Sequence, residues 1–161
     1  MYELASEEVR TTAENIIMRH HRHLTDAHIS YLFREKGWKT ACGKTVLGKA
    51  AKRSEIDKLL SNREEDFIIM ISRPDWERMN SRERESLLDH ELCHCGAVVS
   101  NDGRIKWIVR QHDIGQFASI LARYDFERQK LGNLIENPPD DELIYGQPTT
   151  RMIRREEGGE E

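Results

Sequence analysis

No stretch of this 161-residue chain approaches the ~20 consecutive apolar residues that a membrane-spanning helix needs. We therefore expect no transmembrane segment, in keeping with a mean hydropathy of −0.74 and a charged fraction of 34%. The first eight residues are acidic and contain no apolar run, so we also expect no signal peptide. The length corresponds to about one domain.

Cysteine is scarce as well. The chain contains three cysteines, and an odd number of them without a signal peptide predicts reduced thiols and a cytoplasmic location. We expect Cys42 to be a free thiol in a glycine-flanked loop. Cys93 and Cys95 are expected to be small buried residues that pack beside neighbouring leucines.

Positive charge is not in excess over the whole chain. Twenty-five basic and 29 acidic residues give a net charge of −4, so we expect no general attraction to nucleic acid or to a membrane. The charge is uneven, because residues 34–63 hold nine basic and three acidic side chains, whereas residues 156–161 are acidic. We expect the basic segment to be a solvated face. The alternative is a patch that contacts an acidic substrate or nucleic acid and is sensitive to salt.

The apolar pattern predicts an α+β fold with a small, mostly antiparallel sheet. Ser6 is suited to cap a first helix, and the turn at residues 101–103 is typical of a hairpin. A second helix begins at Asn80, which forms a capping box with Glu83, and we expect it to end at Gly96. The predicted elements are a helix over 6–24, strands over 29–33, 45–51 and 67–71, a polar loop over 52–65, the second helix, a hairpin over 97–109 and a helix over about 113–124.

Two of the seven histidines stand at metal-ligand spacing. His90-Glu91-Leu92-Cys93-His94 has the form H-E-x-x-H and falls within the second predicted helix. Residues four apart lie on one helical face, so both imidazoles can reach one ion at the ~2.0–2.1 Å that zinc prefers. Glu91 is rotated by about 100° around the helix, so it can reach a metal-bound water without being a ligand. The spacing is typical of metal-assisted hydrolysis.

A catalytic zinc site needs a third protein ligand and one open position. His112 is the first candidate, because it lies 18 residues after His94 at the expected start of the last helix. Asp113 is the alternative, since carboxylates also bind zinc. If Asp113 is not a ligand, we expect it to cap that helix or to orient a ligand.

The segment Asp89-His90-Glu91-Leu92-Cys93-His94-Cys95, followed by Gln111-His112-Asp113-Ile114 and Phe117, resembles the two motif blocks of the putative phage metallopeptidase family, which is similar to SprT-like zincin metallopeptidases. The resemblance covers roughly residues 12–126. It implies a zincin-like core in which an N-terminal helix and the HExxH helix pack against the sheet, one catalytic zinc ion and peptidase activity. It also implies that strand 67–71 is an edge strand that pairs with extended substrate, and an ordinary core strand is the alternative.

The chain departs from many SprT-like proteins after this core. Those proteins continue into a zinc ribbon or another DNA-directed region, whereas this chain has no Cys-x-x-Cys pair and ends in an acidic segment. A DNA-linked role is therefore in doubt. We expect a metallopeptidase domain over residues 1–130 and a loop with a flexible acidic tail over residues 131–161.

The remaining histidines are expected to be structural. His20, His21 and His23 cluster at the end of the first predicted helix, where such side chains suit the helix dipole. Their spacing does not provide the ligands of a second metal site. His28 opens a strand and has no assigned role.

These observations predict a zinc metalloendopeptidase that acts on protein or peptide substrates in the cytoplasm, or in the host cytoplasm if a phage encodes it. His90, His94 and His112 would hold the zinc ion. Glu91 would accept a proton from the zinc-activated water and deliver it to the leaving amine.

Some parts of this hypothesis stay open. Tyr124 and Arg110 are near in sequence, but proximity assigns neither as the oxyanion donor. A non-catalytic, zinc-stabilised binding module is one alternative, in which Cys95 or Asp113 would close the fourth position. A nucleic-acid-associated protease is the other.

Overall fold

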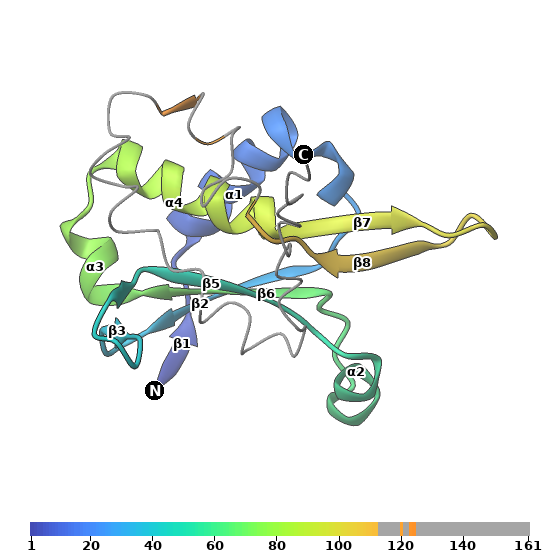
Figure 1. Ribbon diagram of the computed structural model, residues 1–161, viewed down its shortest axis with the longest axis horizontal. Coiled ribbons are helices and arrows are strands. Elements are labelled where there is room, and N and C mark those ends of the chain that lie inside the picture. Colours follow the sequence, from blue (N-terminus) through green and yellow to red (C-terminus); the bar gives the residue numbers. More distant parts are fainter. Residues whose placement is uncertain (113–119, 121–122, 125–161) are drawn as a thin grey trace, which may run out of the picture.

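A four-stranded sheet with helices on one face forms the centre of the fold (Figure 1). The computed structural model describes residues 1–112, 120, 123 and 124. The elements are β1 (Tyr2–Leu4), α1 (Glu7–His20), the 3₁₀ helix η1 (Arg22–Leu24), β2 (Ile29–Arg34), β3 (Trp38–Lys39), β4 (Thr45–Val46), β5 (Gly48–Lys52), α2 (Glu55–Ser61), β6 (Phe67–Ser72), α3 (Arg73–Arg78), α4 (Ser81–His94), β7 (Cys95–Val99) and β8 (Ile105–Val109).

The central sheet has the strand order β1-β2-β6-β5. The β1–β2 and β5–β6 pairs are antiparallel, and the β2–β6 pair is parallel. Two short antiparallel ribbons, β3–β4 and β7–β8, complete the described strands. The α+β class and the mostly antiparallel sheet are therefore confirmed. The expectation that strand 67–71 is an edge strand is wrong and its alternative, a core strand, is confirmed, because β6 lies inside the sheet and β5 is the outer strand.

Helices α1 and α4 pack against each other and cover the same face of the sheet (Figure 1). Apolar residues at helical spacing on both helices meet alternate residues of β6, which is why this layer excludes water. Burial of each large side chain contributes about 1.5–3 kcal/mol. Nine of these core residues are at most 1% exposed: Val9, Ala13, Ile16, Phe67, Ile69, Ile71, Leu87, Leu88 and Leu92.

Helix α4 begins as the sequence predicts. The Asn80 side chain accepts a hydrogen bond from the Glu83 amide, and the Glu83 carboxylate accepts one from the Asn80 amide, both at 2.9 Å. The helix ends at His94, two residues before Gly96. Its end is set by β8, because the chain pairs with that strand from Cys95 onward and the Arg110 amide donates to the His94 carbonyl at 2.7 Å.

Several other boundaries differ from the prediction. The first helix ends at His20 and a separate 3₁₀ turn follows, and the strand expected over 45–51 is divided into β4 and β5. The segment 52–65 contains helix α2, which Ser54 caps by accepting a hydrogen bond from the Asp57 amide at 3.0 Å. The predicted hairpin over 97–109 is confirmed.

The last predicted helix and the tail fall mainly on residues that are not described. Ile120 and Arg123 are helical, as predicted. Asp113 and residues 131–161 lie outside the described residues. No described helix is both long enough and apolar enough to cross a membrane.

Candidate metal centre

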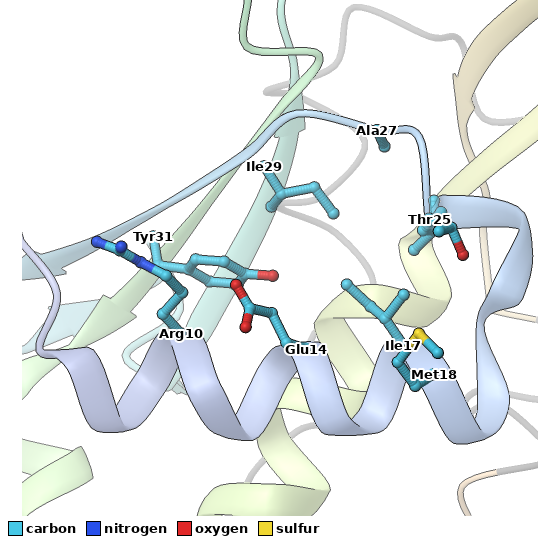
Figure 2. A pocket seen from close by; sticks show the side chains of 9 residues that line it. Arg10, Glu14, Ile17, Met18, Thr25, Ala27, Ile29 and Tyr31 are labelled. Atoms are coloured by element: carbon cyan, nitrogen blue, oxygen red, sulfur yellow. The ribbon is translucent and has the colours of Figure 1, made fainter.

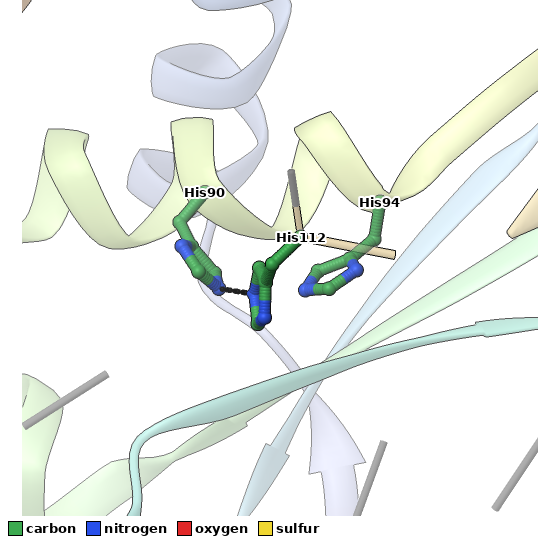
Figure 3. Close-up of side chains that lie close together, drawn as sticks. All are labelled: His90, His94 and His112. Atoms are coloured by element: carbon green, nitrogen blue, oxygen red, sulfur yellow. Dashed lines mark hydrogen bonds between the residues drawn. The ribbon is translucent and has the colours of Figure 1, made fainter. Parts of the chain in front are cut away.

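The three histidines singled out in the sequence converge on one point (Figure 3). His90 and His94 come from consecutive turns of α4, and His112 comes from the segment that follows β8. One ring nitrogen from each imidazole lies within 4.8 Å of the other two. The Nε2 atoms of His90 and His112 are 3.1 Å apart. The group could therefore hold a metal ion.

The orientation of His94 is fixed by a backbone group. Its Nδ1 lies 2.7 Å from the Arg110 carbonyl oxygen. A carbonyl only accepts, so Nδ1 donates, and the lone pair of the neutral ring is on Nε2. The side chain is 2% exposed, and burial lowers the pKa of His94 to about 4. The ring is therefore neutral near pH 7, which a metal ligand requires.

The spacing of the nitrogen atoms fits a small metal ion. Nitrogens that bind a tetrahedral zinc ion at ~2.0–2.1 Å lie about 3.3–3.4 Å apart. The 3.1 Å separation between His90 and His112 is within a few tenths of an ångström of that value. Three imidazoles suit zinc, and they also suit other first-row metals such as copper, iron and nickel.

Glu91 lies between α4 and strand β5. Its side chain is buried, at 3% exposure, and its carboxylate rests against Gly48, the first residue of that strand. A Cβ atom placed on Gly48 would be 2.9 Å from Oε1 of Glu91. A glycine generally weakens a strand, whereas here the side chain that Gly48 lacks leaves space that Glu91 fills.

The outer edge of β5 is the side of the sheet next to α4. The Leu47 carbonyl accepts from the Ser72 amide at 2.8 Å, and the Arg53 amide donates to the Asp66 carbonyl at 2.9 Å. Because backbone groups alternate in direction along a strand, residues of odd number bond to β6 and those of even number face away from it. The residues whose amide and carbonyl groups face the outer edge are Gly48, Ala50 and Lys52.

A second polar cluster lies on the opposite side of α4 and centres on Asp89, which is 0% exposed. His21 Nε2 lies 2.6 Å from Asp89 Oδ1. Arg123 donates to both carboxylate oxygens at 2.6 Å, and the Tyr124 hydroxyl donates at 3.2 Å. Burial acts to raise the pKa of Asp89, but the hydrogen bonds from His21 and Arg123 outweigh it and lower the pKa.

This cluster corrects the expectation for His21. Its ring contacts Asp89 and so links the end of α1 to α4, in addition to any favourable interaction with the dipole of α1. Potential ligand atoms of His21, Asp89 and Cys93 lie within 4.8 Å of one another, so a second group with metal-ligating side chains exists after all. We assign no ion to it, because the Arg123 guanidinium already neutralises the Asp89 carboxylate.

Two residues considered as oxyanion donors support α4 instead. Tyr124 is buried and its hydroxyl is directed at Asp89. The Nε of Arg110 donates to the Cys93 carbonyl at 3.0 Å, and so satisfies a carbonyl in the last turn of the helix. The side chain of Arg110 passes over Gly96, where a Cβ atom would be 2.8 Å from Arg110 Cγ.

None of the three cysteines forms a disulfide, and Cys42 is exposed whereas Cys93 and Cys95 are buried, as predicted. The Cys95 thiol donates to the Glu91 carbonyl at 3.7 Å, and burial raises its pKa well above the ordinary value. The thiol therefore stays protonated near pH 7. His23 contacts the Cys95 carbonyl at 3.0 Å, and His28 is exposed beside Asp66.

Much of the basic segment 34–63 has partners within the protein. The charged groups of Arg34 and Lys49 both lie over the Trp38 ring, 4.7 and 4.9 Å from its centroid. Lys58 pairs with Asp66 at 2.6 Å. These contacts favour the structural interpretation of the segment over a patch for nucleic acid.

A separate pocket of about 390 Å³ lies between α1 and β2 (Figure 2). Its walls include Arg10, Glu14, Ile17, Ile29 and Tyr31. None of the three clustered histidines lines it, so the pocket is not part of the candidate metal centre.

Comparison with known proteins places the chain in a family. A profile of the family described as putative phage metallopeptidase matches residues 1–138. No curated protein and no solved structure matches the chain. On the strength of the profile match, the chain belongs to the putative phage metallopeptidase family.

Proposed function

We propose that this protein is a zinc-dependent endopeptidase with a zincin-like, SprT-like core. The observation that carries the proposal is the convergence of three imidazoles beside α4, a helix whose Glu91 lies against strand β5. Membership of a metallopeptidase family gives the reaction class. The absence of disulfides among the three cysteines is consistent with a peptidase that acts in a reducing cytoplasm, which would be the host cytoplasm if a phage encodes the protein.

His90, His94 and His112 would hold the zinc ion. When bound, zinc supplies Lewis acidity, which polarises a peptide carbonyl and lowers the pKa of a water toward ~7. Burial keeps His94 neutral, and the Arg110 carbonyl holds its ring in the orientation that presents Nε2. The chain thus supplies the ligand orientation before any ion arrives.

Glu91 would act as the general base. It follows His90 by one residue, so it projects from α4 at a different angle from the two ligands of that helix. Its carboxylate would accept a proton from the attacking water and then deliver it to the leaving amine.

The substrate would bind as an extended strand along β5. The outward-facing backbone groups of Gly48, Ala50 and Lys52 can pair with a peptide, whatever its side chains. Because Gly48 lies against Glu91, the scissile bond would lie near that end of the strand. A substrate antiparallel to β5 would place its residues on the amino-terminal side of that bond along Ala50 and Lys52.

The closed, non-catalytic site is less well supported. One of its two candidate fourth ligands, the Cys95 thiol, is buried and directed at the Glu91 carbonyl. The other candidate, Asp113, lies outside the described residues. We propose that solvent and substrate take the fourth position. No observation on the described residues favours a function in nucleic-acid binding.

The proposal is tested by measuring peptide-bond hydrolysis and zinc content together. The purified chain should bind one zinc ion and cleave an unfolded protein such as reduced casein, lose this activity on chelation and regain it with one equivalent of zinc. A crystal of the zinc-loaded protein should show three imidazoles and a solvent molecule on the ion. Stoichiometric zinc with four protein ligands and no cleavage would instead support the binding module.

A further inference from the structure

We infer that Gly48 is a positioning residue for Glu91, because the side chain it lacks is the space in which the Glu91 carboxylate lies. This inference rests on the proposed function of Glu91 as the general base. It concerns a residue of β5 that takes no part in metal binding, and it gives a reason for a glycine at the start of that outer strand.

The contact is close and specific. A Cβ atom on Gly48 would lie 2.9 Å from Oε1 of Glu91 and 3.2 Å from both its Cδ and its Cγ. Carbon atoms in favourable contact are about 3.5–4.0 Å apart. The Oε1, Cδ and Cγ atoms of Glu91 therefore cannot keep their places beside any residue larger than glycine.

The displaced group can move without disturbing the core. Glu91 Oε1 is the end of a flexible side chain, not backbone, so a new methyl group can push it aside at a small cost in stability. A glycine in a strand is less favourable than alanine, and that difference offsets part of the cost. Substitution should therefore change where the carboxylate lies while leaving the fold intact.

Such a displacement matters for a general base. A proton acceptor acts within ~2.6–3.2 Å of the proton's donor atom, and an error of about 1 Å in a reacting geometry can reduce the rate by about 100-fold. Gly48 also has its own amide and carbonyl on the outer edge of β5. The same residue thus sets the position of the base and faces the backbone of the bound peptide.

The main test is Gly48→Ala, with Gly37→Ala as the matched control, because a Cβ atom on Gly37 meets nothing within 4 Å. For Gly48→Ala we expect kcat to fall 10- to 100-fold, while KM changes less than threefold and bound zinc and Tm stay as in the wild type. The control should match the wild type in every respect. Unchanged kcat in Gly48→Ala would overturn the inference, and so would a loss of zinc or of folding as large as the loss of rate.

A double-mutant cycle isolates the contact. Glu91→Asp shortens the acid by one methylene group and withdraws it from position 48, so adding Gly48→Ala to Glu91→Asp should reduce kcat by less than it does in the wild type. Equal effects in the two backgrounds would contradict direct contact.

Crystal structures of metal-free wild type and Gly48→Ala separate this inference from the proposed function. The Glu91 carboxylate should shift in the variant, and an unshifted carboxylate would overturn the inference even if the protein is a peptidase. The wild type could instead cleave no peptide while the carboxylate still shifts in the variant. That result would contradict the catalytic role of Glu91, but it would confirm that Gly48 determines where the Glu91 carboxylate lies.

Discussion

Asp89 and Arg123 are joined by two hydrogen bonds of 2.6 Å, from Nε to Oδ2 and from Nη2 to Oδ1. Asp89 immediately precedes His90 on α4, and Arg123 lies 11 residues beyond His112. This ion pair therefore links the segment that follows His112 to α4, the helix that carries His90 and His94. His21 and Tyr124 complete the contacts of the same carboxylate.

We predict that Asp89→Asn lowers the free energy of unfolding by about 3 kcal/mol, because it removes one partner of a buried ion pair and leaves Arg123 uncompensated. Urea unfolding of the chelator-treated protein measures the change. Asp102→Asn is the control, since Asp102 pairs with Arg104 on the surface and its loss should lower the free energy of unfolding far less. An equal decrease in the free energy of unfolding for the two variants would contradict a stabilising role for the buried Asp89–Arg123 ion pair.

The same pair predicts a pH dependence. Hydrogen bonds from His21 and Arg123 lower the pKa of Asp89 in the folded state below the ~3.9 of an unfolded aspartate. The carboxylate therefore stabilises the fold fully above about pH 4, and this stabilisation is lost as the pH falls through the folded-state pKa. The stability difference between wild type and Asp89→Asn should shrink as urea titrations move from pH 6 to pH 3. A difference that is constant over this range would show that the charge of Asp89 contributes nothing.

Gly96→Ala should weaken metal binding. The new Cβ atom would be 2.8 Å from Cγ and 3.0 Å from Cδ of Arg110, the residue whose carbonyl orients His94. Groups that orient a metal ligand typically contribute 10- to 100-fold in affinity, so we expect about a tenfold rise in the Kd for zinc, measured by competition with a chromogenic chelator. Gly37→Ala should bind zinc as the wild type does. Wild-type affinity in Gly96→Ala would show that Arg110 does not govern the position of His94.

His112→Ala should remove the third ligand. We expect the chain to retain well under one equivalent of zinc after dialysis against a weak chelator, and added zinc to raise its Tm much less than that of the wild type, since ligand-induced stabilisation scales with affinity. His28→Ala is the control, because its side chain is 67% exposed and lies outside the cluster. Full zinc retention in His112→Ala would assign the third ligand elsewhere, with Asp113 the first residue to test.

Local signals in the sequence were sufficient to predict most of α4 and the relative positions of its two histidines, His90 and His94. The Asn80 and Glu83 capping box and the period of the leucines fixed the start and the buried face of that helix, and i,i+4 geometry then placed His90 beside His94. The end of the helix could not be predicted in the same way. It depends on pairing with β8, and that strand begins 11 residues after His94.

Features that depend on distant parts of the chain were missed. The apolar run of β6 fits either an edge or an inner strand, and its place between β2 and β5 is decided by pairings 15 to 38 residues apart in sequence. The contacts of Asp89 with His21 and Arg123 span 68 and 34 residues. Helix α2 was missed for another reason: its Ser54 cap is a local signal, but its apolar side chains are exposed and so lack a buried face.

The catalytic role of Glu91 is tested most directly by Glu91→Gln. Glutamine has nearly the same shape but cannot accept the proton of the attacking water, so the variant should bind one equivalent of zinc with wild-type affinity and lose at least about 100-fold in kcat/KM for peptide hydrolysis. Zinc content and initial rates must be measured on the same preparation. Stoichiometric zinc with a strongly reduced rate is the predicted result, and stoichiometric zinc with the full wild-type rate would contradict the account.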